Sequence, residues 1–163
     1  MHMSTSAKLA ALFALLVSGS AWADGGTSCA TAQEIFRDQN YAGDTSTSTS
    51  FVGAFGGLPS PGPDLAFKLT GTGGNDTTIS VTIVGGWNAG GVITASCGGN
   101  AGTPISAATS TTAFNLPTTA LTQGTLYYFY MTGNPSDASG PSGAFAFMWP
   151  SIIPVVLQTF WVE

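Results

Sequence analysis

The sequence predicts an all-β fold, an antiparallel β-sandwich or jelly roll of about eight strands. Runs of β-branched and aromatic residues recur at intervals of roughly 10 to 14 residues, and clusters of Gly, Pro, Asn and Asp separate most of them. Helix-favouring residues are dense only in the short segment 29–38. A chain of short strands punctuated by turns at this spacing is typical of sandwiches and jelly rolls.

The strands expected in the first half have one polar face or are polar throughout. Residues 45–52 form a Thr- and Ser-rich run, which we expect at a sheet edge. Residues 65–70 and 77–84 alternate apolar with polar side chains, as strands with one buried face do. Residues 91–97 form the next expected strand, after a Gly-rich turn that we place at 85–91.

The strands expected in the second half are more apolar. Residues 111–116 form a short strand. Residues 125–132 (TLYYFYMT) are apolar or aromatic on both faces, which predicts a central strand whose tyrosines belong to the core. Residues 144–149 place three aromatic side chains on one side, and residues 155–162 form the last expected strand.

Residues 1–23 have the three-part pattern of a secretory signal peptide. A polar start containing Lys8 precedes the apolar run 9–17, and an Ala-x-Ala site ends at Ala23. A transmembrane anchor is the alternative, but it needs about 20 apolar residues, and this run is shorter. We therefore expect cleavage after Ala23 and a secreted protein in the periplasm, at the cell surface or outside the cell.

Cleavage leaves a chain of low charge. It removes Lys8, so two cations remain against eight carboxylates, a formal net charge of −6. Two cations cannot build a phosphate-binding surface, which excludes nucleic acid as a partner. We expect no membrane span either, because prolines at 150 and 154 interrupt the most apolar later segment. Weak charge repulsion leaves self-association or binding to a neutral polymer open, beside the plain surface of a secreted domain.

The chain contains two cysteines, Cys29 and Cys97. In an oxidising compartment an even count favours a disulfide, and only one intramolecular pairing exists. Such a bridge would join the start of the domain to its middle and contribute on the order of 4 kcal/mol. Two buried free thiols are the alternative.

We divide the rest of the chain into a β-domain, residues 24–149, and a tail, residues 150–163. The tail is led by a proline and is apolar on both alternations of its strand pattern. A strand buried on both faces has this pattern, and so does a strand given to the sheet edge of a neighbouring molecule.

Six short motifs follow one another between residues 28 and 148: Cys29-Ala30-Thr31-Ala32-x-x-Ile35, Gly43-Asp44-Thr45, Gly62-Pro63-Asp64-Leu65-Ala66-Phe67-Lys68-Leu69-Thr70, Val92-Ile93-Thr94-Ala95-Ser96-Cys97-Gly98, Leu121-Thr122-x-Gly124-Thr125-Leu126-Tyr127-Tyr128 and Ser139-Gly140-x-x-Gly143-Ala144-Phe145. In this order they resemble the bacterial pre-peptidase C-terminal (PPC-like) domain and its stand-alone relatives.

The resemblance implies a jelly-roll sandwich that acts as a non-catalytic module of exported proteins. Some relatives bind insoluble polymers, and some bind calcium. Family members often carry further cysteines that this chain lacks, so the resemblance does not supply the pairing of Cys29 with Cys97.

The residue inventory speaks against an enzyme. His2 is the only histidine, and it leaves with the signal peptide. The remaining chain therefore lacks the side chain required for a Ser-His-Asp triad, a Cys-His pair or a histidine-ligated metal. We expect no catalytic residue and no cofactor, with a carboxylate-dependent hydrolase as the remaining enzymatic alternative.

Asp44 and Asp64 are the carboxylates best placed for chemistry, because each stands in a turn before an expected strand. We expect both to cap backbone N–H groups of those turns. The alternatives are an acid–base pair and a calcium site completed by backbone carbonyls.

Trp87 and Asn88 are the candidate ligand-binding residues, in the Gly-rich segment between two expected strands. An exposed indole can stack on a sugar ring while a neighbouring amide bonds its hydroxyls. The alternative is an indole folded back over the end of the core.

The sequence therefore favours a non-catalytic exported module with a binding or cell-surface role, whose ligand is a polysaccharide or a protein polymer. A self-assembling extracellular subunit that uses the apolar tail is the second hypothesis. A carboxylate-dependent hydrolase is the third.

Overall fold

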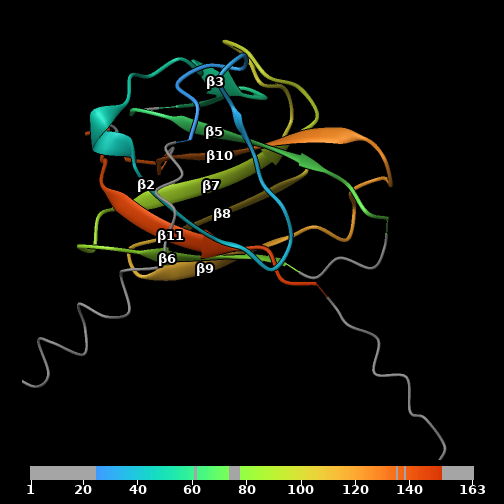
Figure 1. Ribbon diagram of the computed structural model, residues 1–163. Helices are drawn as coiled ribbons and strands as arrows, with labels where there is room; N and C mark the ends of the chain where they lie inside the picture. Colours follow the sequence, from blue (N-terminus) through green and yellow to red (C-terminus); the bar gives the residue numbers. More distant parts are fainter. Residues whose placement is uncertain (1–24, 61, 74–77, 135, 138, 152–163) are drawn as a thin grey trace, which may run out of the picture.

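Two stacked β-sheets form the body of the described part of the molecule, and a two-stranded hairpin accompanies them (Figure 1). The computed structural model describes residues 25–151 except 61, 74–77, 135 and 138. The expected signal peptide and the expected strand 155–162 lie outside the described residues. The described part contains eleven strands and one 3₁₀ helix, η1 (Thr45–Thr47): β1 Gln33–Glu34, β2 Asn40–Asp44, β3 Ala54–Phe55, β4 Leu58–Pro59, β5 Leu65–Thr70, β6 Thr78–Ile83, β7 Ala89–Thr94, β8 Ser106–Ser110, β9 Ala113–Pro117, β10 Leu126–Gly133 and β11 Ala144–Met148.

The strand order defines a five-stranded sheet, β1-β5-β10-β7-β8, and a four-stranded sheet, β2-β11-β6-β9. Neighbours are antiparallel except for β1, which runs parallel to β5. A separate hairpin, β3-β4, pairs with neither sheet and packs on the outer face of the five-stranded one. The predicted all-β sandwich is confirmed.

Most of the expected strands are present. The alternating segments became β5 and β6, and the Thr125–Thr132 run became β10, which lies in the middle of the five-stranded sheet as predicted. β7 begins two residues before and ends three residues before the strand expected at 91–97, so Ala89 and Gly90 belong to a strand rather than to a turn.

The polar strand expected at 45–52 is wrong. The chain leaves β2 at Asp44, whose carboxylate Oδ1 accepts hydrogen bonds from the Ser46 N–H (2.8 Å) and the Ser46 hydroxyl (2.6 Å). This cap starts η1 and ends the extended conformation. The sequence also missed β8, whose residues SAATS offer no apolar alternation and a single β-branched side chain, that of Thr109.

The inner core fills the space between the two sheets. Alternate residues of β5, β7 and β10 meet alternate residues of β6 and β11 there. The Phe147 ring lies 4.9 Å from that of Phe67 and 5.0 Å from that of Phe129, measured between ring centroids, so aromatic rings join the two sheets directly and edge to face. Such edge-to-face contacts add to the hydrophobic stabilisation from the buried area.

A second apolar group, the outer cluster, lies on the opposite face of the five-stranded sheet. Its residues come from that face and from the loops over it: Ala32, Val52, Phe55, Ala66, Val92, Ala101 and Tyr130. β10 contributes side chains to both groups. Its two faces are both apolar because one packs in the inner core and the other packs in the outer cluster. We call the segments 48–60 and 95–104, which lie over this face, the outer cover.

Candidate functional site

The Cys29–Cys97 disulfide ties the outer cover to the start of the domain. The Cα atoms of the two cysteines lie 5.7 Å apart, and the bridge spans 68 positions. The predicted pairing is confirmed. Cys97 also packs against the outer cluster, so the bridge holds one end of the 95–104 segment on the sheet.

Asp64 holds the other segment of the cover. Its Oδ2 accepts hydrogen bonds from the backbone N–H groups of Phe51 (3.2 Å) and Val52 (3.1 Å), and its Oδ1 accepts one from the Ser60 hydroxyl (2.7 Å). The residue is fully buried. Burial raises the pKa of this carboxyl above its ordinary value, and the hydrogen bonds from Ser60, Thr132, Val52 and Phe51 oppose that shift.

The hairpin β3-β4 forms the raised part of the outer cover. Gly56 and Gly57 have φ angles of +58° and +96°, which glycine adopts without strain, and they make the tight turn between its strands. Phe55 packs edge-on against Tyr130 at 5.2 Å, while Leu58 is 52% exposed. Backbone bonds from Gly53 N–H to the Gly99 carbonyl (2.7 Å) connect the two segments of the cover.

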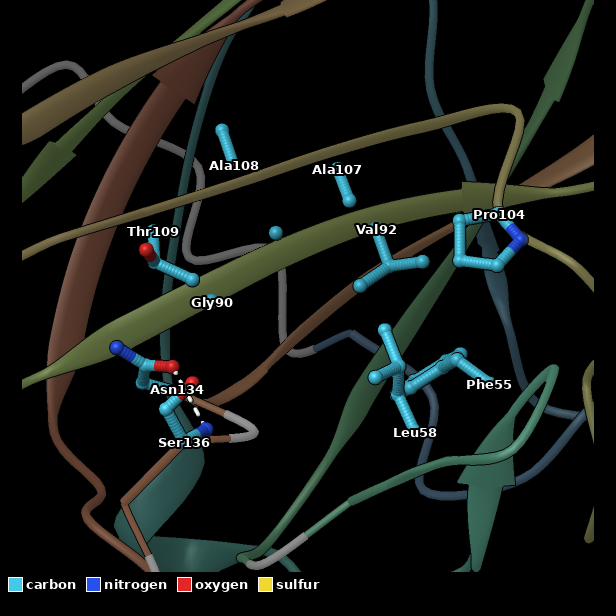
Figure 2. Close-up of a pocket in the computed structure, with 11 residues that line it drawn as sticks. Phe55, Leu58, Gly90, Val92, Pro104, Ala107, Ala108, Thr109, Asn134 and Ser136 are labelled. Atoms are coloured by element: carbon cyan, nitrogen blue, oxygen red, sulfur yellow. Dashed lines mark hydrogen bonds between the residues drawn. The ribbon is translucent and has the colours of Figure 1, made fainter.

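A groove with a volume of about 250 Å³ opens where the outer cover stops (Figure 2). Its floor is the outward face of β7 and β8, where Gly90 pairs with Thr109 and Val92 pairs with Ala107. In Figure 2, Val92 lies between two groups: Phe55 and Leu58 are on one side of it, and Ala107 is on the other side. The groove exists because the floor carries small side chains beside a wall of larger ones.

Polar groups close one end of the groove. The Asn134 side chain lines it and accepts a hydrogen bond from the Ser136 N–H (2.9 Å), drawn dashed in Figure 2. Asn134 Nδ2 donates to Asn88 Oδ1 (3.0 Å), and Asn88 Nδ2 donates to Asp137 Oδ2 (3.1 Å). Hydrogen bonds from Ser139 and Asn88 lower the pKa of the Asp137 carboxyl. Asn88 thus positions the groove's amide rather than lining the groove itself.

Trp87 lies half-buried against the inner core. Its indole N–H donates to the Ala144 carbonyl at 2.9 Å, and its ring covers Gly143, where an added Cβ would lie 2.5 Å from the indole Cδ1. The indole therefore has a structural partner and is not among the groove residues. Contact of Trp87 with carbohydrate stays a prediction.

The two candidate carboxylates serve different turns. Asp44 caps η1, and Asp64 anchors the outer cover. Neither lines the groove. Among the described residues, no group of three or more His, Cys, Asp or Glu side chains is arranged to hold a metal ion.

The groove is the feature that sequence reasoning missed. Its only local signal was the pair Gly90-Gly91 followed by β-branched residues, which we interpreted as a turn leading into a strand. Gly91 faces inward, where an added Cβ would lie 2.4 Å from the Phe114 ring, so close packing explains this glycine.

Comparisons of the chain with protein-family models, with curated proteins and with solved structures find no match. Within the described ranges, no helix is long and apolar enough to cross a membrane. The fold and the groove are therefore the basis for the functional argument.

Proposed function

We propose that this protein is a non-catalytic, exported binding module that holds an uncharged, extended polymer segment in the groove over β7 and β8. The observation that carries the proposal is the groove itself, a depression of about 250 Å³ with apolar walls and polar groups at one end. Binding sites for small or extended ligands commonly combine these features.

The chemistry of the lining supports an uncharged ligand. None of the eleven described residues that line the groove carries a charge. The polar groups there are hydroxyls of Thr109 and Ser136 and the amide of Asn134. Such groups bond to hydroxyls and amides, which neutral polysaccharides and protein backbones both present.

Export is part of the proposal. Residues 1–23 have the signal-peptide pattern, and the Cys29–Cys97 disulfide suits an oxidising compartment. The resemblance to the pre-peptidase C-terminal domain belongs to the proposal too, and the β-sandwich fold supports it.

The carboxylate arrangement supports a role without catalysis. Asp64 is enclosed by the donors that it anchors and has no exposed surface. Asp44 accepts two hydrogen bonds within its own turn. A glycosidase needs a pair of carboxylates flanking its substrate, and none of the described residues that line the groove is a carboxylate.

A matched pair of substitutions tests the groove. Ala107 lies in β8 at the groove, and Ala113 lies in β9 of the other sheet; both are exposed alanines on edge strands. Ala107→Phe fills the groove, whereas Ala113→Phe places the same ring elsewhere. Retention of the protein on cellulose, chitin and collagen fibrils is measured in sedimentation assays.

We expect at least one of these polymers to retain the wild type and the Ala113→Phe variant equally well. The Ala107→Phe variant should bind that polymer about tenfold more weakly than the wild type does. Equal retention of both variants would overturn the assignment of the groove. Failure of all three polymers to retain the wild type would overturn the proposal that it binds a neutral polymer.

A further inference from the structure

We propose that the outer edge of β8, with which no described strand pairs, binds residues 152–162 of a second copy of this chain as an added strand, together with the groove beside that edge. The inference uses the groove of the proposed function and names a partner for it. It concerns an interaction between copies, which the polymer test above does not measure.

The β8 edge lacks the protection that the other sheet edges carry. Of the strands that the structure describes, four end the two large sheets: β1, β2, β8 and β9. Edge strands are usually guarded by charged side chains or proline against pairing with another chain. β1 contains Glu34, β2 contains Asp44 and β9 ends in Pro117, whereas β8 (SAATS) contains neither a charge nor a proline.

The side chains beside this edge leave room for a guest strand. Ala107 and Thr109 are exposed and point to the groove side of β8. A strand added next to β8 would place every second side chain beside them. In this mode the backbone bonds supply affinity, and a pocket for alternate side chains supplies specificity.

Residues 152–162 have the chemistry of such a guest. The segment IIPVVLQTFWV carries no charge, and β-branched or aromatic residues dominate it. Its one proline stands near the start, which leaves eight residues behind it with N–H groups for pairing. An uncharged guest matches an uncharged edge and groove.

The place where the described chain stops favours a neighbour as the acceptor. Ser151 donates its N–H to Asp38 Oδ1 at 2.8 Å, and Asp38 N–H donates to the Trp149 carbonyl at 2.9 Å. Asp38 lies between β1 and β2, so Ser151 is held at the edge opposite β8 and β9. A donor at one edge and an acceptor at the other give head-to-tail contacts between copies.

Length argues against the tail reaching its own β8. Residues 152–163 span about 40 Å when fully extended, and pairing with five residues uses about 17 Å of that. About 23 Å of tail then remains. This length would have to cross the width of a five-stranded sheet, about 19 Å, and also part of the roughly 10 Å that separates two stacked sheets. A tail in its own molecule has almost no slack, whereas a neighbour's edge has no such constraint.

Sedimentation velocity of the chain from Asp24 onward, which contains every described residue, tests the inference over a range of concentrations. Ala107→Lys adds a charge to the β8 edge, and Ala113→Lys adds the same charge to β9 as the matched control. Leu157→Asp and Phe160→Asp each place a charge on one of the two alternations of the tail.

We expect the wild type and Ala113→Lys to form concentration-dependent oligomers. Ala107→Lys and at least one tail variant should weaken association about tenfold or more. A synthetic peptide of residues 152–163 should compete with the tail for the β8 edge and so reduce the fraction of oligomers. A wild type that stays monomeric, tail variants that both associate normally, or equal weakening by the two lysines would each overturn the inference.

The two proposals fail separately. A monomeric protein whose polymer retention is lost in Ala107→Phe keeps the proposed function and overturns the tail as a partner. An oligomeric protein that no polymer retains keeps the tail and overturns the neutral-polymer function.

Discussion

The inner core and the outer cluster lie on opposite faces of the same five-stranded sheet, and they are held in different ways. The inner core is made by strands from two sheets, and its aromatic rings meet directly across them. The outer cluster is smaller and is completed by loops. Those loops are fixed by the Cys29–Cys97 disulfide and by the Asp64 carboxylate.

The difference shows what each kind of covering layer requires. A second sheet satisfies its own backbone by strand pairing and brings an apolar face with it, so burial alone holds it in place. The outer cover has two-residue strands at most, so a covalent bond and a buried acceptor replace sheet pairing. It also covers its sheet incompletely, and the groove over β7 and β8 is the part left open.

The largest effect is expected in the inner core. Phe67→Ala removes a fully buried ring that contacts Phe129 and Phe147, and we expect a loss of about 3–5 kcal/mol in the free energy of unfolding. Urea denaturation measures it. The control Phe36→Ala removes a ring that is 54% exposed and should change stability by less than about 1 kcal/mol. Equal losses would contradict the assignment of Phe67 to the core.

Removal of the disulfide should act on the outer cover. The double variant Cys29→Ser, Cys97→Ser loses a bridge across 68 positions, which the loop-entropy model values at on the order of 4 kcal/mol. Hydrogen exchange should rise more in the outer cover, segments 48–60 and 95–104, than in β10. Uniform acceleration of exchange along the chain would show that the bridge supports both regions equally.

Loss of the Asp64 carboxylate should have a smaller effect in the same region. Asp64→Ala leaves the N–H groups of Phe51 and Val52 without their acceptor, and we expect a loss of about 2–3 kcal/mol. Asp44→Ala removes only the η1 cap and should cost about 1 kcal/mol. Thermal unfolding of both variants compares them. A larger loss for Asp44→Ala would contradict the role given to Asp64.

The smallest effect is a pH dependence caused by Asp64. Burial raises its pKa in the folded protein, so the fold retains the proton at pH values where the unfolded chain has released it. Stability of the wild type relative to Asp64→Asn should therefore grow as the pH falls from neutral toward the ordinary aspartate pKa of about 4. A difference that shrinks on acidification would mean that hydrogen bonding outweighs burial and lowers this pKa.

Sequence reasoning reached the elements whose evidence is local. β5, β6 and β10 were predictable because alternation, or apolar residues on both faces, fixes how a strand is buried. Counting two cysteines predicted the one possible disulfide. The segment 45–52 was not predictable as a strand or a turn, because the cap from Asp44 competes with strand formation and composition does not reveal which wins.

The sequence by itself determined the all-β class, the inward faces of the main strands and the lack of charge. The tertiary structure decided which way Trp87 turns, which donors surround Asp64 and where the outer face of β7 and β8 stays uncovered. The physical reason is distance along the chain. The groove joins Leu58 to Thr109 and Asn134, and strand pairing and loop placement bring these positions together without any local pattern that records it.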